Sequence, residues 1–298
     1  MEPRSLGGEP KIRPGCTTDF VRHSDGSVDF ALEAIRQMGL DRVELVSSCA
    51  YCVFASQRFC SVLTMLQEPM EVRAKLQAHD LKPSQLACHA PLAGPEASEY
   101  GLSTLLHAIR FASEVGAPYV STVECWWLAP DASEGETFAQ LRQNLGTVLE
   151  SASLYEVGVN IETRGPFSRT LRGALSLMEL VPGELGSWLG LSFDPGEAFR
   201  AGEDPLTFLR AAQSKVRHLH VADVSATSDP CAHDYSYSCA VPLGDGVLGD
   251  SIEDCLRLLA ESDWRGVASL HVDGIEEARL SADRLRRMLR AVQPDRLR

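Results

Sequence analysis

Short apolar runs alternate with amphipathic helical stretches along almost the whole chain. A first strand is expected near residues 12–18. It precedes "VDFALEAIRQMGL" at residues 28–40, where apolar side chains recur with helical spacing and a glycine stands near the end. Strands are expected again in "RVELVSS", "LACHAPL", "YVSTVECWW", "VNIETR", "LGLSFDPG", "VRHLHVADV" and "GVASLHVDG". Repeated strand–helix–strand units require a parallel sheet. About eight units in 298 residues predict one closed (β/α)8 TIM barrel spanning residues 1–298, with a core of about residues 11–292. An open doubly wound sheet is the alternative.

The charge balance limits the partners of such a chain. It carries 28 basic and 41 acidic residues, a formal charge of −13. Nucleic-acid affinity comes largely from Lys and Arg on phosphates, so we expect neither nucleic acid nor an anionic membrane as a partner. No apolar run approaches the roughly 20 residues that span a bilayer, and the N-terminal segment has no signal-peptide character. We therefore expect a soluble cytoplasmic protein with a small-molecule partner, and a homo-oligomer is compatible with the sequence.

Two other classes of site have weak support. No glycine-rich dinucleotide or phosphate-binding fingerprint follows any of the expected strands. The nine cysteines are scattered through the chain, and Cys49 and Cys52 form a single CxxC. A zinc site would need two further ligands, and Cys231 and Cys239 are an unusual second pair. Free thiols are the preferred interpretation.

Polar side chains stand at the ends of six of the expected strands. In a (β/α)8 barrel the chemistry takes place at the C-terminal ends of the strands. These side chains can therefore converge on one pocket, although capping of helices and backbone hydrogen bonding are the alternative. A carboxylate inside a barrel mouth is costly unless it is paired or bound to metal, which favours a metal or acid–base role. The six residues are His89, Glu124, Glu162, Asp194, His220 and His271.

The order of these motifs resembles the sugar isomerase/epimerase superfamily, the sugar phosphate isomerases and epimerases built on the xylose isomerase-like TIM barrel. The similar segments run from about residue 28 to residue 292. They are "ALEAIRQMGLDRVEL", "HAPL", "NIETR", "LSFDPGEAFRAGEDPLTFL", "VRHLHVADV" and "PLGDGVLG". The resemblance implies the barrel fold and one divalent metal, held by a Glu, an Asp, a His and a second Glu from the fifth to eighth strands.

Three of the four implied metal ligands are present in kind. Glu162 matches the first Glu and Asp194 matches the Asp. His220 matches the His, because the family pattern His-x-x-Asp is met by His220 and Asp223. His218 shares the strand face of His220 and is expected one layer lower, in the core or behind the metal.

Two positions depart from the family pattern. The Glu of the eighth strand is replaced by His271, and the motif Asp-x-x-His of the sixth strand ends here in Glu197. We expect Glu162, Asp194, His220 and His271 to bind the metal, with Mn, Zn, Co or Fe favoured over Mg by the two imidazoles. His271 is either a ligand or a base at a given moment, because a nitrogen lone pair bound to metal cannot accept a proton. The ligand interpretation is preferred, because the matching position in the family binds metal.

The resemblance implies an isomerase or epimerase that removes a proton next to a metal-bound carbonyl of a small sugar-like substrate. Glu162 and His271 are the expected acid–base groups. A lyase that dehydrates a cyclic polyol on the same scaffold, and a metal- or sugar-binding protein that has lost catalysis, are the alternatives. The other residues predicted to contact substrate are His89, Glu124, Trp126, Arg164, Glu197 and His233.

Overall fold

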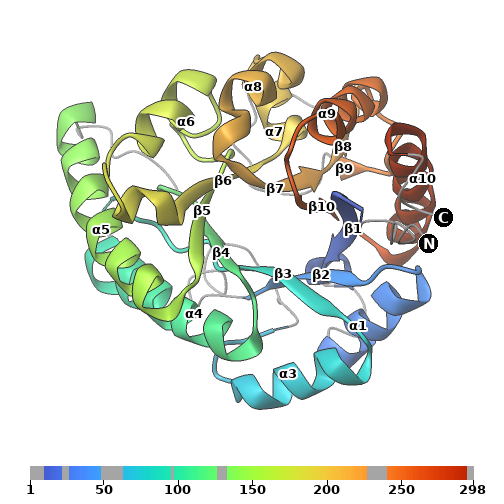
Figure 1. The fold of residues 1–298 in the computed structure, drawn as a ribbon, viewed down its shortest axis with the longest axis horizontal. Helices are drawn as coiled ribbons and strands as arrows, with labels where there is room; N and C mark the ends of the chain where they lie inside the picture. The colour runs from blue at the N-terminus through green and yellow to red at the C-terminus, as the bar shows by residue number, and fades with distance from the viewer. Residues whose placement is uncertain are drawn as a thin grey trace, which may run out of the picture.

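The computed structural model describes residues 10–21, 27–47, 63–94, 97–125, 133–226 and 240–293. Eight parallel strands form a closed barrel in the order β1-β10-β7-β6-β5-β4-β3-β2, which confirms the predicted (β/α)8 fold (Figure 1). The barrel strands are β1 (Ile12–Thr17), β2 (Arg42–Val46), β3 (Lys82–Ala87), β4 (Tyr119–Thr122), β5 (Gly158–Glu162), β6 (Leu189–Phe193), β7 (Val216–Val221) and β10 (Gly266–Leu270).

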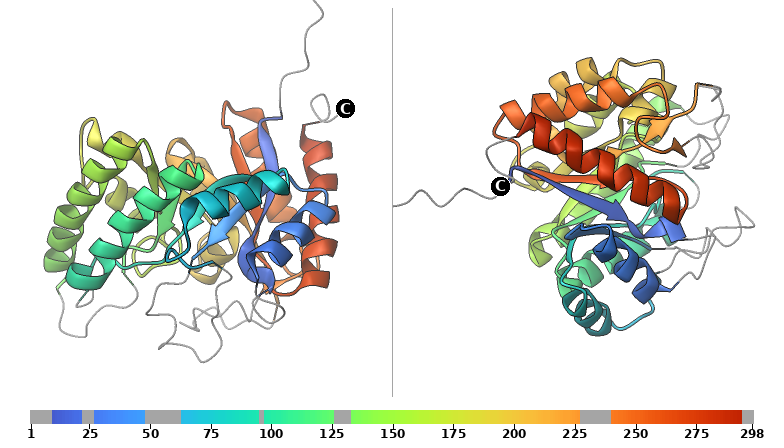
Figure 2. Two further views of the ribbon diagram at one scale, coloured as in Figure 1. Left: turned by 90° about the horizontal axis from the view of Figure 1, so that it is seen from below. Right: turned by 90° about the vertical axis from the view of Figure 1, so that its right-hand side faces the viewer.

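Helices surround this barrel, with α4 and α5 on one side and α10 on the other (Figure 2). The α-helices are α1 (Val28–Gln37), α3 (Pro69–Ala78), α4 (Leu102–Val115), α5 (Glu134–Tyr155), α6 (Leu171–Met178), α7 (Pro195–Arg200), α8 (Pro205–Ala212), α9 (Gly249–Glu261) and α10 (Ile275–Val292). Shorter helical turns are η1 (Thr18–Val21), the π-helical η2 (Ala97–Gly101), η3 (Leu185–Trp188) and η4 (Gln213–Lys215). No helix among the described residues is long and apolar enough to cross a membrane.

Local signals in the sequence set several helix starts. Ser27 accepts a hydrogen bond from a backbone N–H at the start of α1. Ser133 and Glu136 form a reciprocal capping box at the start of α5. Asp194 caps the short α7, which the apolar pattern did not predict. A second difference lies after β7, where β8 (Asp223–Val224) and β9 (Ala240–Val241) pair antiparallel within a segment expected to be partly loop.

Three strands end earlier than the segments that predicted them, and β3 begins at Lys82, four residues before its predicted start at Leu86. β3 ends at Ala87, β4 at Thr122 and β10 at Leu270. His89, Glu124 and His271 therefore lie just beyond their strands, at the end of the barrel where a TIM barrel holds its chemistry.

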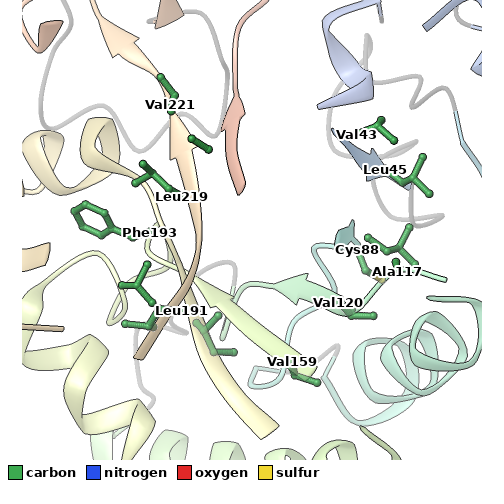
Figure 3. Packing of buried hydrophobic residues seen from close by; sticks show 14 of the residues in the cluster. Val43, Leu45, Cys88, Ala117, Val120, Val159, Leu191, Phe193, Leu219 and Val221 are labelled. Atoms are coloured by element: carbon green, nitrogen blue, oxygen red, sulfur yellow. The ribbon is translucent and has the colours of Figure 1, made fainter. Parts of the chain in front are cut away.

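The hydrophobic core lies between the sheet and the helices. Val43 and Leu45 flank Glu44 in β2, and Leu219 and Val221 flank His220 in β7; these apolar side chains are buried in the cluster drawn in Figure 3. Neighbouring residues of a strand point to opposite faces. The interleaved polar side chains therefore fill the lumen of the barrel, where apolar layers are usual.

Candidate metal and acid–base site

Three of the four predicted metal ligands come together at the end of the barrel. The Oδ2 atom of Asp194 lies 4.0 Å from Nδ1 of His220 and 3.8 Å from Nδ1 of His271. All three side chains are buried, and they form a group whose ligand atoms lie within 4.8 Å of one another. Among the described residues this group does not include Glu162.

The donor set and its spacing fit a divalent ion. Two ligands held about 2.1 Å from one tetrahedral ion lie about 3.4 Å apart, so the separations of 4.0 and 3.8 Å from Oδ2 of Asp194 are about 0.6 and 0.4 Å too wide. Two imidazoles and one carboxylate suit Mn, Fe, Co or Zn. Asp194 would hold such an ion through Oδ2, and His220 and His271 would each hold it through Nδ1.

Asp194 serves the backbone and the site with different oxygens. Its Oδ1 accepts hydrogen bonds from the N–H groups of Gly196 and Glu197, at 2.7 and 3.2 Å, and caps α7. Its Oδ2 faces the two histidines. Burial alone would raise the pKa of Asp194, but His271 and His220 hold it below its ordinary value. The cap thus fixes an ionised carboxylate with one oxygen available for a metal.

Glu162 lies at the end of β5, and its carboxylate has protein partners of its own. Nε2 of His89 lies 3.0 and 3.1 Å from its two oxygens, and the hydroxyl of Ser121 donates to Oε1 at 2.7 Å. Nη1 of Arg164 is 3.6 Å from Oε2. Burial raises the pKa of Glu162, but His89, His220 and Arg164 outweigh it and lower this pKa below its usual range. Glu162 is therefore an ionised carboxylate held beside the candidate metal ligands, and its own predicted role as a ligand stays a prediction.

His89 holds an unusual backbone conformation to reach that carboxylate. Its φ of 44° lies in the left-handed region, which costs energy for a residue with a side chain. Strain of this kind is common at functional sites. The predicted role of His89 in binding substrate stays a prediction, and its contact with Glu162 orients that carboxylate.

Glu124 is fully buried and holds the loop after β5. Its Oε1 accepts hydrogen bonds from the N–H groups of Phe167 and Ser168, and its Oε2 accepts one from the Ser168 hydroxyl. The carbonyl oxygen of Glu162 lies 2.7 Å from the same hydroxyl and shares its single proton with Glu124. Burial raises the pKa of Glu124, and these hydrogen bonds, which lower it, offset only part of that rise. Contact of Glu124 with substrate stays a prediction. Both of its carboxylate oxygens accept hydrogen bonds from the loop that carries Arg164.

Glu197 occupies the first turn of α7, where the family pattern has a histidine. Nη1 of Arg200 donates to its Oε1 at 3.3 Å. Burial raises the pKa of Glu197, with the charge of Asp194 adding to it and Arg164 and Arg200 acting against it. Glu197 and Arg164 therefore place one carboxyl group and one positively charged guanidinium close to Asp194. Trp126 and His233, the other predicted substrate contacts, lie outside the described residues.

The sequence did not single out Glu44, which the structure places beneath the candidate metal ligands. Its two oxygens lie 3.0 Å from Nε2 of His218 and 3.0 Å from Nε2 of His220. Burial would raise the pKa of Glu44, but the two imidazoles hold it well below its ordinary value. The available signal was one acid interrupting the apolar strand "RVELV".

His220 carries the proton that this carboxylate attracts. Burial lowers the pKa of His220, but Glu44, Glu162 and Asp194 outweigh it and raise it to about 9. Burial dominates for His218 and lowers its pKa. In the metal-free protein His220 is therefore the imidazolium partner of Glu44, and a metal has to displace its proton.

Asp19, in η1 after β1, is a second carboxylate that the sequence did not single out. It is buried, its Oδ1 accepts a hydrogen bond from the Thr17 hydroxyl at 2.5 Å, and its Oδ2 lies 3.9 Å from Nε2 of His271. His271 therefore lies between Asp194 on its Nδ1 side and Asp19 on its Nε2 side.

Comparison with known proteins agrees with this architecture. A family model described as xylose isomerase-like TIM barrel matches residues 32–291. A search of curated proteins gives no significant match.

Three solved structures illustrate the likeness. The "probable 3-DHS dehydratase AsbF" of Bacillus anthracis has a TM-score of 0.73 at 17% identity, covering 92% of this chain and 99% of that one. L-ribulose 3-epimerase has a TM-score of 0.73 at 14% identity, covering 95% and 96%. The IOLI protein with a bound zinc atom has a TM-score of 0.72 at 15% identity, covering 96% and 99%. At these identities the likeness establishes the fold alone.

Proposed function

Because the chain belongs to the xylose isomerase-like TIM-barrel family, we propose that it is a metal-dependent isomerase or epimerase of a small polyhydroxy carbonyl compound. One observation carries this proposal. Asp194, His220 and His271 bring their ligand atoms within 4.8 Å of one another, beside the ionised carboxylate of Glu162. Metal ligands next to a carboxylate base are what proton removal beside a carbonyl requires.

The bound ion would supply Lewis-acid polarisation of the substrate carbonyl and stabilise the negative charge that develops on its oxygen. Glu162 is the group that takes the proton from the neighbouring carbon. His89 and Ser121 hold its two oxygens in place, so the base needs little reorganisation when substrate arrives. Arg164, 3.6 Å from Glu162, adds positive charge at the mouth, where an anionic or hydroxyl group of substrate can bind.

The geometry at His271 favours a reaction with one base. Its Nδ1 faces Asp194 among the metal ligands, 3.8 Å from Oδ2. A histidine used as a ligand through that nitrogen cannot also return a proton with it. Aldose–ketose isomerisation, in which Glu162 both removes and returns the proton, fits this arrangement better than epimerisation by two opposed bases.

A lyase is the second candidate, and the same arrangement at His271 supports it. Elimination of water from a cyclic polyol also begins with removal of a proton next to a carbonyl, and it needs only one base. Among similar folds, the B. anthracis protein is described as a probable dehydratase. Arg164 and Glu197 are then the groups available to help a hydroxyl leave.

A turnover screen in deuterium oxide tests these proposals. The protein, loaded with Mn, Zn or Co, is incubated with ketoses, sugar acids and inososes, and the products are analysed by mass spectrometry. Deuterium in a product of unchanged composition supports isomerisation, and loss of water supports the lyase. A metal-loaded protein that binds these compounds without turnover would contradict both and leave a binding protein.

A further inference from the structure

The lumen beneath the metal ligands contains an organised layer of polar side chains. Glu44 of β2 meets His218 and His220 of β7, although these two strands are not neighbours in the barrel. The contacts therefore cross the lumen. All three side chains are nearly inaccessible to solvent, and a buried carboxylate of this kind is stable only when its oxygens accept hydrogen bonds.

The charge on Glu44 sets the direction of the hydrogen bonds that its carboxylate makes. An ionised carboxylate only accepts, so the Gln85 amide that lies 2.9 Å from Oε1 presents its nitrogen. The oxygen of Gln85 then accepts from the Asn160 amide at 3.1 Å and from the Ser192 hydroxyl at 3.0 Å. The same rule makes Nε2 of both histidines a donor toward Glu44.

We propose that Glu44 is a positioning residue for the metal site, which holds the proton of His220 on Nε2 and leaves Nδ1 to bind the ion. This inference rests on the proposed function, in which Asp194, His220 and His271 bind the metal. The position of the ring supports it. Nε2 of His220 is 3.0 Å from Glu44, and Nδ1, on the other side of the ring, is 4.0 Å from Oδ2 of Asp194.

A carboxylate behind a ligating histidine fixes the tautomer and raises the basicity of the other nitrogen. Glu44 does this for His220 from across the lumen, while its second oxygen takes the Nε2–H of His218. His218 thus fixes the orientation of the Glu44 carboxylate. His218 thereby has a role in the site without being a metal ligand.

The structure also contains a competing arrangement. Glu44, His218 and His220 themselves form a group whose ligand atoms lie within 4.8 Å of one another. A metal in that group would use Nε2 of His220 and displace the hydrogen bonds to Glu44. The two arrangements share His220 and differ in which of its nitrogens is bound, so a measurement of that nitrogen decides between them.

Nitrogen-15 NMR of the histidine rings in zinc-loaded wild-type protein is the primary test. His220 is assigned as the signal that disappears in His220→Gln. The proposal predicts a proton on Nε2 and zinc on Nδ1. Zinc on Nε2 would overturn it and place the metal between Glu44 and His218. This measurement needs no Glu44 variant, so it does not depend on whether such a variant folds.

Glu44→Gln then tests the positioning role directly. In this variant the oxygen of the new amide stays toward the Gln85 amide nitrogen and Nε2 of His220, because both donate to it. The new amide nitrogen therefore faces His218. We expect His220 to keep its proton on Nε2, His218 to move its proton to Nδ1, and zinc affinity to fall by about 10- to 100-fold. The zinc affinity is the deciding readout, because a hydrogen bond to His218 with a merely structural role would move the His218 tautomer equally. Unchanged zinc affinity would overturn the proposal.

Ser84→Ala is the matched control. Ser84 is buried on the adjacent β3, and its hydroxyl donates to the carbonyl of Val43, next to Glu44 in the chain. The variant removes one buried hydrogen bond from the same strand pair, outside the layer of polar residues in the lumen. Its zinc affinity should match the wild type. If wild-type protein binds none of Mn, Zn and Co, the proposed function fails. The His220 tautomer of metal-free protein in alkaline solution still tests Glu44, because a proton on Nδ1 would overturn its role.

Discussion

Nε2 of His89 lies 3.0 Å from one carboxylate oxygen of Glu162 and 3.1 Å from the other. His89 follows β3 and Glu162 is the last residue of β5, and the backbone of His89 takes a left-handed conformation with φ of 44°. This contact joins a residue expected to bind substrate to the residue expected to move the proton. It makes the acidity of Glu162 depend on His89.

His89→Asn should move the acidic limb of the kcat/KM profile to higher pH. His89 helps to lower the pKa of Glu162, so its removal raises that pKa and leaves less ionised base in mildly acidic solution. The surface variant His79→Asn, whose imidazole contacts Glu33, is the control and should leave the profile in place. An acidic limb at the same pH in His89→Asn would show that His89 does not tune the base.

Glu162→Gln should lose most of the turnover and retain metal. An amide of the same size cannot accept the proton, and loss of a general base typically costs about 10²- to 10⁴-fold in rate. The ligand group formed by Asp194, His220 and His271 remains complete, so the metal should stay bound. Rate and metal content are measured on the same preparation. Turnover within a few-fold of wild type would remove Glu162 from the mechanism.

Asp194→Asn should separate the two roles of that side chain. Asn caps helices about as well as Asp, so α7 should keep its start while the metal loses a carboxylate ligand. Asp194→Ala should in addition lose about 1 kcal/mol of stability through the missing cap. Asp204, which caps α8 through a hydrogen bond from the Thr207 N–H at 2.7 Å, is the control: Asp204→Ala should lose stability and keep metal. Stoichiometric metal in Asp194→Asn would contradict the assignment.

The stability of the metal-free protein should depend on His220. Folding raises the pKa of His220 from 6.5 to about 9. A histidine with a raised pKa stabilises the fold fully below its unfolded value, and this contribution is lost as pH rises through the folded value. The melting temperature of metal-free protein should therefore fall from about pH 6.5 to about pH 9 more steeply than that of His220→Gln. Parallel curves for the two proteins would count against the Glu44–His220 ion pair.

The fold followed from the sequence because each strand and helix carries its own pattern. Alternation of apolar runs gave eight parallel strands, and polar residues at their ends gave Asp194, His220 and His271 as neighbours. These predictions needed only periodicity and the rule that chemistry lies at the C-terminal end of a barrel. The choice of His220 over His218 came from the family spacing, and the structure places His220 beside Asp194.

The contacts across the lumen did not follow. Glu44 and His218 are 174 residues apart, on strands that are not adjacent in the sheet, and no local pattern pairs them. The role of Glu124 was hidden for a similar reason. Its carboxylate bonds to backbone N–H groups more than 40 residues away, and such bonds leave no mark on residue type.

The central claim is that Asp194, His220 and His271 hold one metal ion at the mouth of the barrel. Anomalous X-ray diffraction from zinc-soaked crystals of the wild-type protein tests it most directly. We predict one ion at about 2.1 Å from Oδ2 of Asp194, Nδ1 of His220 and Nδ1 of His271. An ion bound instead between Glu44, His218 and Nε2 of His220, or no anomalous peak near these side chains, would contradict it.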